Sequence, residues 1–132
     1  MTEPSKPSLR VLAVDDESLI RMSLRIALAR EGYQVDTASC GVEAMALIDQ
    51  FRYDLVLLDL RLPDVSGIEV LRYARRHDPE VKVLLVTAST HAPSALEAAE
   101  EGAVGVVAKP FTLKTIAAAT RRAIAGPSRL TG

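Results

Sequence analysis

The sequence contains a single cysteine, Cys40, no tryptophan and few aromatic residues. A single cysteine excludes an internal disulfide and is typical of proteins from a reducing compartment. The chain also lacks an excess of charge of either sign, with 16 Lys and Arg against 17 Asp and Glu. A nucleic-acid-binding domain normally carries a basic excess, so we expect no direct contact with nucleic acid.

Long apolar segments are missing as well. No stretch approaches the roughly 18 residues needed to cross a bilayer, and residues 1–7 have no apolar region of the kind found in signal peptides. The sequence therefore predicts a cytoplasmic protein that does not bind membranes. Its 132 residues fit one domain of ordinary size, which we assign to 8–126, with flexible tails at 1–7 and 127–132.

Short apolar runs alternate five times with segments of helical periodicity, which predict strands and helices respectively. The expected strands are 9–14, 33–38, 55–58, 81–86 and 104–108. The expected helices are 18–30, 41–50, 68–76, 94–101 and a last helix that Thr112 caps and that ends near 125. This order predicts an α/β fold: a doubly wound, five-stranded parallel sheet of flavodoxin-like order 2-1-3-4-5 with helices on both faces.

Polar residues follow four of the expected strands at the edge where such sheets form their sites. These residues are Asp15 and Asp16, Asp59, Thr87, and Lys109. Two carboxylates about 4 Å apart in one shallow site repel each other by roughly 4 kcal/mol at an effective dielectric near 20. A bound Mg²⁺ would relieve that repulsion. Lys109 and Thr87 suit the oxygens of a phosphate, and Asp59 is then free to act as a nucleophile that forms an acyl phosphate.

Each of these residues also has a purely structural interpretation. An aspartate after a strand is often only a helix N-cap, and a threonine or lysine at a strand end is often structural or solvated. The full arrangement, with Asp-Asp, Asp, Thr and Lys-Pro each after a different apolar strand, favours a phosphoryl-transfer site over chance.

Four segments of the chain resemble the receiver domain of two-component response regulators, over about residues 8–126. They are Val14-Asp15-Asp16-Glu17, the run from Leu58 to Glu69, Val86-Thr87-Ala88, and Ala108-Lys109-Pro110-Phe111. The resemblance implies a CheY-like response regulator that accepts a phosphoryl group and changes conformation to control a downstream output. A pseudo-receiver that is never phosphorylated and only binds other proteins is the alternative.

The resemblance also implies a role for each site residue. Asp59 would be the phosphoacceptor and, with Asp15, Asp16 and the backbone carbonyl of Arg61, would hold Mg²⁺, Asp16 directly and Asp15 through water. Thr87 and Lys109 would bind the phosphoryl oxygens. The Lys109–Pro110 peptide bond would be cis, an arrangement found almost only before proline.

Partners follow from the same resemblance. The donor would be a sensor histidine kinase or a histidine phosphotransfer protein, and the receiver would act on an output domain or a separate effector. It would catalyse its own phosphorylation and dephosphorylation without being an enzyme in the ordinary sense. The start of the first helix contacts the donor in this family, so exposed Leu19 and Met22 side chains would indicate a docking surface, whereas buried ones would be core.

Three positions concern the output and the lifetime of the phosphorylated state. The family's usual switch aromatic, three residues before the lysine, is replaced by Val106. Because valine is small and stiff at χ1, the aromatic form of the switch is not expected here, and the loop 88–93 is an alternative route to the surface. Arg61 and Ser89, each two residues past a site residue, are expected to influence the access of water to the acyl phosphate.

Overall fold

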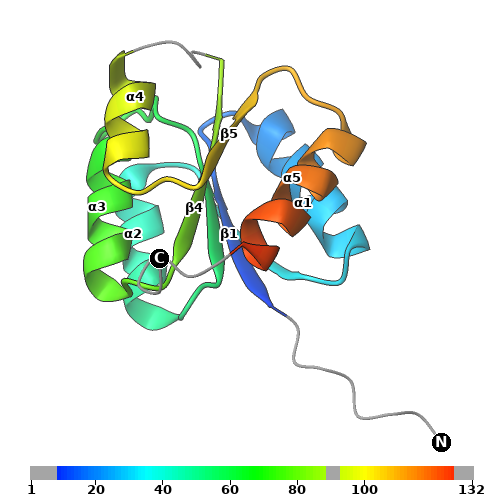
Figure 1. The fold of residues 1–132 in the computed structure, drawn as a ribbon, viewed down its shortest axis with the longest axis horizontal. Helices are drawn as coiled ribbons and strands as arrows, with labels where there is room; N and C mark the ends of the chain where they lie inside the picture. The colour runs from blue at the N-terminus through cyan, green and yellow to red at the C-terminus, as the bar shows by residue number, and fades with distance from the viewer. Residues whose placement is uncertain (1–8, 89–92, 127–132) are drawn as a thin grey trace, which may run out of the picture.

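The computed structural model describes residues 9–88 and 93–126, which form five strands and five helices in alternation (Figure 1). The strands are β1 (Arg10–Val14), β2 (Gln34–Ala38), β3 (Leu55–Leu58), β4 (Lys82–Thr87) and β5 (Gly105–Ala108). The helices are α1 (Ser18–Arg30), α2 (Gly41–Gln50), α3 (Gly67–His77), α4 (Pro93–Glu100) and α5 (Leu113–Ala125). Within these ranges every helix is too short or too polar to span a bilayer. The tails predicted at 1–7 and 127–132 lie outside the described residues.

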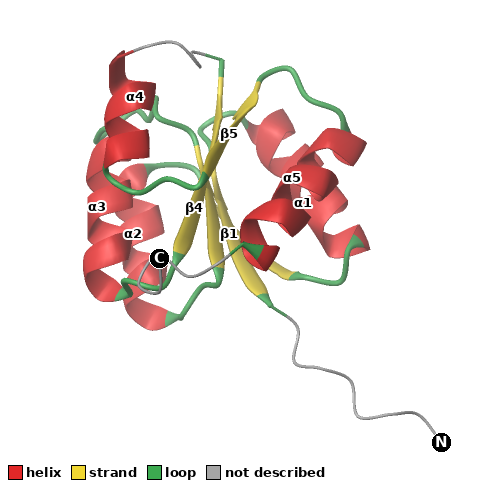
Figure 2. Ribbon diagram, viewed as in Figure 1, coloured by secondary structure: helices red, strands yellow, loops and turns green. Residues whose placement is uncertain are grey.

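The strands form one sheet of order β2-β1-β3-β4-β5, and every neighbouring pair is parallel. Helices α1 and α5 cover one face of the sheet, and α2, α3 and α4 cover the other (Figure 2). The predicted doubly wound fold and its strand order are confirmed. In this topology the winding reverses between β1 and β3, and open α/β sheets generally bind ligands at the carboxyl ends of strands at such a point.

The central strand β3 shows why the strands of this sheet appear in the sequence as uninterrupted apolar runs. Leu55 and Leu57 lie in the core that the sheet shares with α1 and α5. Val56 and Leu58 lie in the opposite core, shared with α2, α3 and α4. All four side chains are buried, because a parallel strand between two helix layers has no solvent-facing side.

Four strands begin one residue later than the apolar pattern predicted, at Arg10, Gln34, Lys82 and Gly105. At one of these boundaries, Val81 is buried, but its N–H donates to the carbonyl of Asp78 in a turn. An apolar pattern reports burial and does not report which backbone groups pair across the sheet. The predicted strand starts were therefore one residue too early in four cases, and β4 ends one residue later than predicted, at Thr87.

The helix ends follow ordinary capping chemistry. The Oγ1 of Thr112 accepts the N–H of Thr115 at 3.0 Å, which confirms the predicted cap of α5. Ser66 caps α3 by accepting the N–H of Glu69 at 3.3 Å. After α1 the chain passes through Gly32 at φ +93°, a conformation that glycine adopts without strain.

Candidate functional site

Four chemically active side chains gather at the carboxyl edge of the sheet. Asp15 follows β1, Asp59 follows β3, Thr87 ends β4 and Lys109 follows β5. Backbone bonds hold neighbouring strand ends together: the N–H of Asp59 donates to the carbonyl of Val14 at 3.1 Å, and that of Lys109 to Thr87 at 3.0 Å. The structure thus brings together residues that are widely separated in the chain.

The Lys109 ammonium lies between two carboxylates. Its Nζ is 2.5 Å from Oδ2 of Asp15 and 2.9 Å from Oδ2 of Asp59, with Oε1 of Glu17 farther away at 3.5 Å. Asp15 is fully buried and Asp59 is 6% exposed, so water screens these charges weakly. One ammonium faces two nearly buried carboxylates, and the site therefore keeps a negative charge that a second cation would balance.

Different causes raise the pKa of the Asp15 carboxyl and the pKa of the Lys109 ammonium. Burial raises the pKa of the Asp15 carboxyl above its ordinary value, against the hydrogen bond and charge of Lys109. For Lys109, burial acts to lower the pKa, but the hydrogen bonds and charges of Asp15 and Asp59 outweigh it and raise the pKa. The ammonium is therefore protonated throughout the neutral pH range.

Three carboxylates cluster after β1, one of them buried in the site and two exposed at its mouth. One oxygen from each of Asp15, Asp16 and Glu17 lies within 4.8 Å of the others, and Asp16 and Glu17 are exposed. We predicted metal binding for Asp15, Asp16, Asp59 and the Arg61 carbonyl but not for Glu17, although the acidic run that contains Glu17 is visible in the sequence. Oxygen donors open to solvent on one side fit Mg²⁺, which keeps several of its waters.

The loop after β3 holds the other oxygen of the Asp59 carboxylate. The Arg61 N–H donates to Oδ1 of Asp59 at 3.1 Å, while the Arg61 side chain is exposed. The Gly67 N–H closes the loop by donating to the carbonyl of Leu60 at 2.9 Å. A Cβ on Gly67 would lie 2.6 Å from the Asp59 carbonyl oxygen, so this close approach requires glycine.

The family model described as the response regulator receiver domain matches residues 11–121. The chain belongs to the response regulator receiver domain family. As a member, it is a receiver domain of two-component phosphorelay signalling. It is 41% identical over 110 residues to the alginate biosynthesis transcriptional regulatory protein AlgB of Pseudomonas aeruginosa, over 83% of this chain and 24% of AlgB. The chain spans between about a quarter and half the length of the curated relatives it matches.

Solved structures agree with this assignment. A CheY-like receiver domain protein from Methanospirillum hungatei superposes with a TM-score of 0.85 at 29% identity, over 89% of this chain and 94% of that chain. The response regulator protein TrrA from Thermotoga maritima is 37% identical with a TM-score of 0.77, over 86% of this chain and 97% of TrrA. The fold and the family are thus supported independently.

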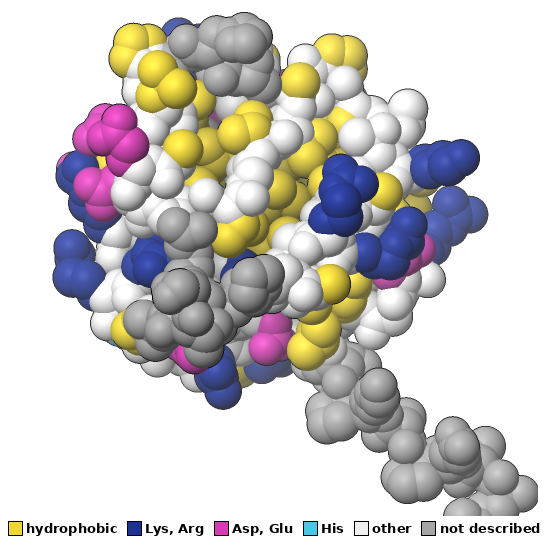
Figure 3. All heavy atoms as spheres, viewed as in Figure 1, with side chains coloured by type: hydrophobic (Ala, Val, Ile, Leu, Met, Phe, Trp, Pro, Cys, Tyr) yellow, Lys and Arg dark blue, Asp and Glu magenta, His cyan; other side chains and the backbone are white. Residues whose placement is uncertain are grey.

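Two predictions concern the strand β5 side of the receiver domain. The Lys109–Pro110 peptide bond is cis, as predicted. Val106 is 42% exposed and pairs with Leu85 in the register of β4 and β5. Apolar side chains gather over β5 between α4 and α5 (Figure 3), and here a groove of about 440 Å³ has a lining of which half is glycine or alanine. Val106 therefore leaves open space beside β5. Ser89 lies outside the described residues.

The start of α1 presents apolar side chains to solvent beside the receiver's acidic residues. Leu19 is 74% exposed and Met22 is 57% exposed, so neither belongs to the core. Between them, Arg21 turns back and donates from Nη1 to the carbonyl oxygen of Asp15 at 2.7 Å. This bond holds the turn that carries the acidic run.

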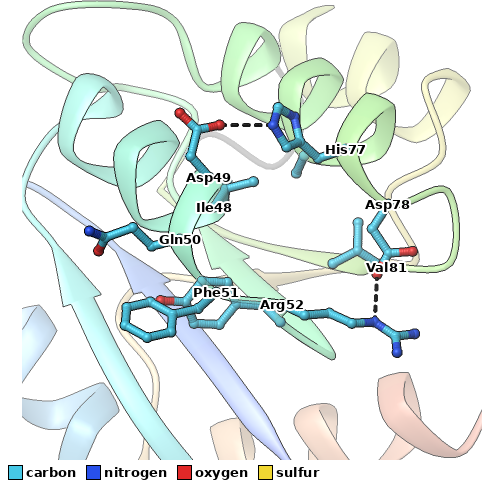
Figure 4. A pocket seen from close by; sticks show the side chains of 10 residues that line it. Ile48, Asp49, Gln50, Phe51, Arg52, His77, Asp78 and Val81 are labelled. Carbon is cyan, nitrogen blue, oxygen red and sulfur yellow. Dashed lines mark hydrogen bonds and ion pairs between the residues drawn. The ribbon is translucent and has the colours of Figure 1, made fainter.

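A different kind of pocket lies at the opposite, amino edge of the receiver's sheet, between the ends of α2 and α3 (Figure 4). Its volume is about 430 Å³, and paired side chains cross it. Nε2 of His77 lies 2.8 Å from Oδ1 of Asp49, and Nε of Arg52 lies 3.2 Å from Oδ2 of Asp78. Each acid here has its own basic partner, unlike the carboxylates at the other edge.

Proposed function

We propose that Asp59 accepts a phosphoryl group from a phosphohistidine of a sensor kinase or phosphotransfer protein. The observation that carries this proposal is the setting of the Asp59 carboxylate. It is nearly buried at the carboxyl edge of the sheet, with Oδ1 on the Arg61 N–H and Oδ2 on the Lys109 ammonium. These two contacts fix the orientation of the side chain, and orientation is a main contribution of proteins to phosphoryl transfer.

The transfer exchanges one bond for another. A carboxylate oxygen of Asp59 attacks phosphorus, the P–N bond to the donor imidazole breaks, and its electron pair stays on the imidazole nitrogen. The product is an acyl phosphate, which water later hydrolyses to regenerate the carboxylate. Lys109 would move from Asp59 to the incoming phosphoryl oxygens, and Thr87, which ends the neighbouring strand, would bind another oxygen. The receiver thus promotes its own phosphorylation and dephosphorylation.

We assign a Mg²⁺ site to Asp15, Asp16, Asp59 and the backbone carbonyl of Arg61, with Asp16 as a direct ligand and Asp15 acting through water. When bound, the ion would neutralise charge on the phosphoryl group. Two of these residues, Asp15 and Asp16, belong to a cluster of three carboxylates with Glu17, which supports this assignment. So does the relative TrrA, whose structure was solved in complex with Mg²⁺ and BeF.

We place the docking surface for the phosphodonor on α1. Leu19 and Met22 are exposed next to the acidic residues, where a donor must approach to bring its histidine to Asp59. The relative AlgB is named a transcriptional regulatory protein, which supports control of an output domain or effector by this receiver. We expect this signalling to take place in the cytoplasm. We expect no contact between this domain and nucleic acid or membrane.

The output would depend on Thr87 rather than on an aromatic switch. Thr87 is buried at the end of β4, and a phosphoryl group on Asp59 would draw it inward and favour a second conformation. Because Val106 is too small to follow as an aromatic ring would, we propose residues 88–93 as the route to the surface, of which 89–92 lie outside the described residues.

The experiment compares the wild type with Asp59→Asn, using Asp54→Asn as the control. Asp54 lies at the other end of β3, where its Oδ2 accepts the Arg10 N–H. With Mg²⁺ and acetyl phosphate, intact mass should show a base-labile phosphoryl adduct in the wild type and in Asp54→Asn but none in Asp59→Asn. The absence of an adduct, and of any spectral response to beryllofluoride, in folded wild-type protein would contradict the proposal and favour an interaction module.

A further inference from the structure

The loop between β3 and α3 is held at two places, which together leave it little freedom. At its base, the Gly67 N–H bonds to the Leu60 carbonyl, and Gly67 packs directly against the backbone of Asp59. At its tip, residue Asp64 reaches across to the start of α2. The segment from 60 to 67 is therefore a closed loop whose tip is tied to a different helix.

The tie at the tip is made by both oxygens of the Asp64 carboxylate. Oδ1 accepts the N–H of Gly41 at 2.8 Å and that of Val65 at 2.9 Å, and Oδ2 accepts the N–H of Val42 at 2.9 Å. The N–H groups of Val42 and Gly41 lower the pKa of Asp64 to about 2. Cys40 stands at the N-cap of α2 without a side-chain cap bond, so Asp64 supplies this cap from a distant loop.

Packing reinforces the hydrogen bonds. A Cβ on Gly41 would lie only 2.1 Å from Cγ2 of Val65. Val65 therefore sits directly on the first residue of α2, and the loop cannot move toward the helix without a clash. Movement away from the helix would break the two bonds from Asp64 to Gly41 and Val42.

The tied loop is also the loop that orients the phosphoacceptor. Arg61 is three residues before Asp64 in the chain, and its N–H holds Oδ1 of Asp59. Its carbonyl is the backbone ligand in the proposed Mg²⁺ site. A continuous set of contacts thus runs from the N-terminus of α2, through Asp64 and the loop, to the Asp59 carboxylate.

We propose that Asp64 is a positioning residue that couples the N-terminus of α2 to cation binding and phosphoryl transfer at Asp59. The inference rests on the proposed function of Asp59 and Arg61. Because energetic coupling is reciprocal, Mg²⁺ binding tightens the bonds between Asp64 and α2. Loss of those bonds in turn weakens Mg²⁺ binding, by about tenfold for a supporting residue of this kind.

The test measures Mg²⁺ affinity by amide NMR titration and hydrogen exchange at Gly41 and Val42, in the absence of any phosphodonor. The variants are Asp64→Ala and Asp64→Asn, and Asn keeps one acceptor oxygen. Glu69→Ala is the control, because it removes the same charge from an exposed residue just beyond the other end of the loop. Global stability is measured for each variant, so a general loss of structure is recognised.

In the wild type, Mg²⁺ should slow exchange of the Gly41 and Val42 amides, although neither residue is a ligand. Asp64→Ala should weaken Mg²⁺ binding about tenfold and abolish the slowing of exchange. The Mg²⁺ affinity of Asp64→Asn should lie between those of the wild type and Asp64→Ala. The Mg²⁺ affinity of Glu69→Ala should stay within about twofold of the wild type. If folded Asp64→Asn binds Mg²⁺ as tightly as the wild type, and Mg²⁺ does not slow exchange at Gly41 or Val42 in the wild type, the coupling is overturned while the proposed function of Asp59 stands. A wild type that binds no Mg²⁺ at Asp16 and Asp59 overturns the proposed function as well.

Discussion

The two edges of the sheet use the same kinds of side chain in opposite ways. At the amino edge, Asp49 pairs with His77 and Asp78 with Arg52, one base to each acid (Figure 4). At the carboxyl edge, among the residues that the structure describes, the one ammonium of Lys109 is shared between the fully buried Asp15 and the nearly buried Asp59. Matched pairs hold elements together, whereas an excess of buried charge of one sign creates a demand for a ligand. The imbalance, more than the presence of charged residues, distinguishes the edge that carries the proposed phosphorylation site.

The largest effect should come from removing the shared cation. Lys109→Ala leaves Asp15 and Asp59 without an ammonium, and breaking a buried ion pair in this way costs about 3 kcal/mol of unfolding free energy. Mg²⁺ should restore part of the loss, because it supplies the missing positive charge. Chemical denaturation at neutral pH, with and without Mg²⁺, measures both quantities.

The matched control is Lys114→Ala on the exposed side of α5. It should change the unfolding free energy by less than about 0.5 kcal/mol and show no special response to Mg²⁺. Equal losses in the two variants would contradict the view that the carboxyl edge carries an excess of buried negative charge.

A smaller effect is expected from breaking a partly buried hydrogen bond at the amino edge. The Tyr53 hydroxyl donates to Oδ2 of Asp36 at 2.7 Å, and Tyr53 is 3% exposed. Tyr53→Phe should lower the unfolding free energy by about 1 kcal/mol and leave the yield of phosphoryl adduct unchanged. Thermal denaturation and intact mass, run on the same samples, check the two parts. A loss of phosphorylation would show that the two edges are not independent.

The exposed pair at the amino edge should matter still less. The Arg52 side chain is 77% exposed, and surface ion pairs of this kind contribute at most about 1 kcal/mol. Arg52→Ala should therefore lower stability only slightly, and added salt should remove the difference from the wild type. A loss of unfolding free energy that does not depend on salt and is as large as that of Lys109→Ala would contradict the proposed difference between the two edges.

The smallest effect concerns pH. The pKa of Asp64 is lowered to about 2 by backbone N–H groups, so the carboxylate favours the folded state above its ordinary pKa near 3.8. That contribution is lost as the pH falls through the folded value. The stability difference between the wild type and Asp64→Asn, measured without Mg²⁺, should shrink as the pH drops from about 4 toward 2. A difference that stays constant would show that the Asp64 charge does not support the helix.

The sequence alone was enough to predict the fold, which the structure confirms, and to name the polar residues that the structure brings together at the strand ends. Burial of both sheet faces produces apolar runs that can be recognised locally, and parallel strands bring their carboxyl ends to one edge. The apolar pattern and the strand order were therefore enough to place Asp15, Asp59, Thr87 and Lys109 together.

Only the tertiary structure decided which of these groups touch and which surfaces stay open. The sharing of Lys109 between Asp15 and Asp59, the exposure of Leu19, and the cap that Asp64 places on α2 each depend on how elements far apart in the chain pack together. Sequence periodicity describes one element at a time. The contacts of a side chain with a different element are set by the distances and orientations between elements, which no local pattern records.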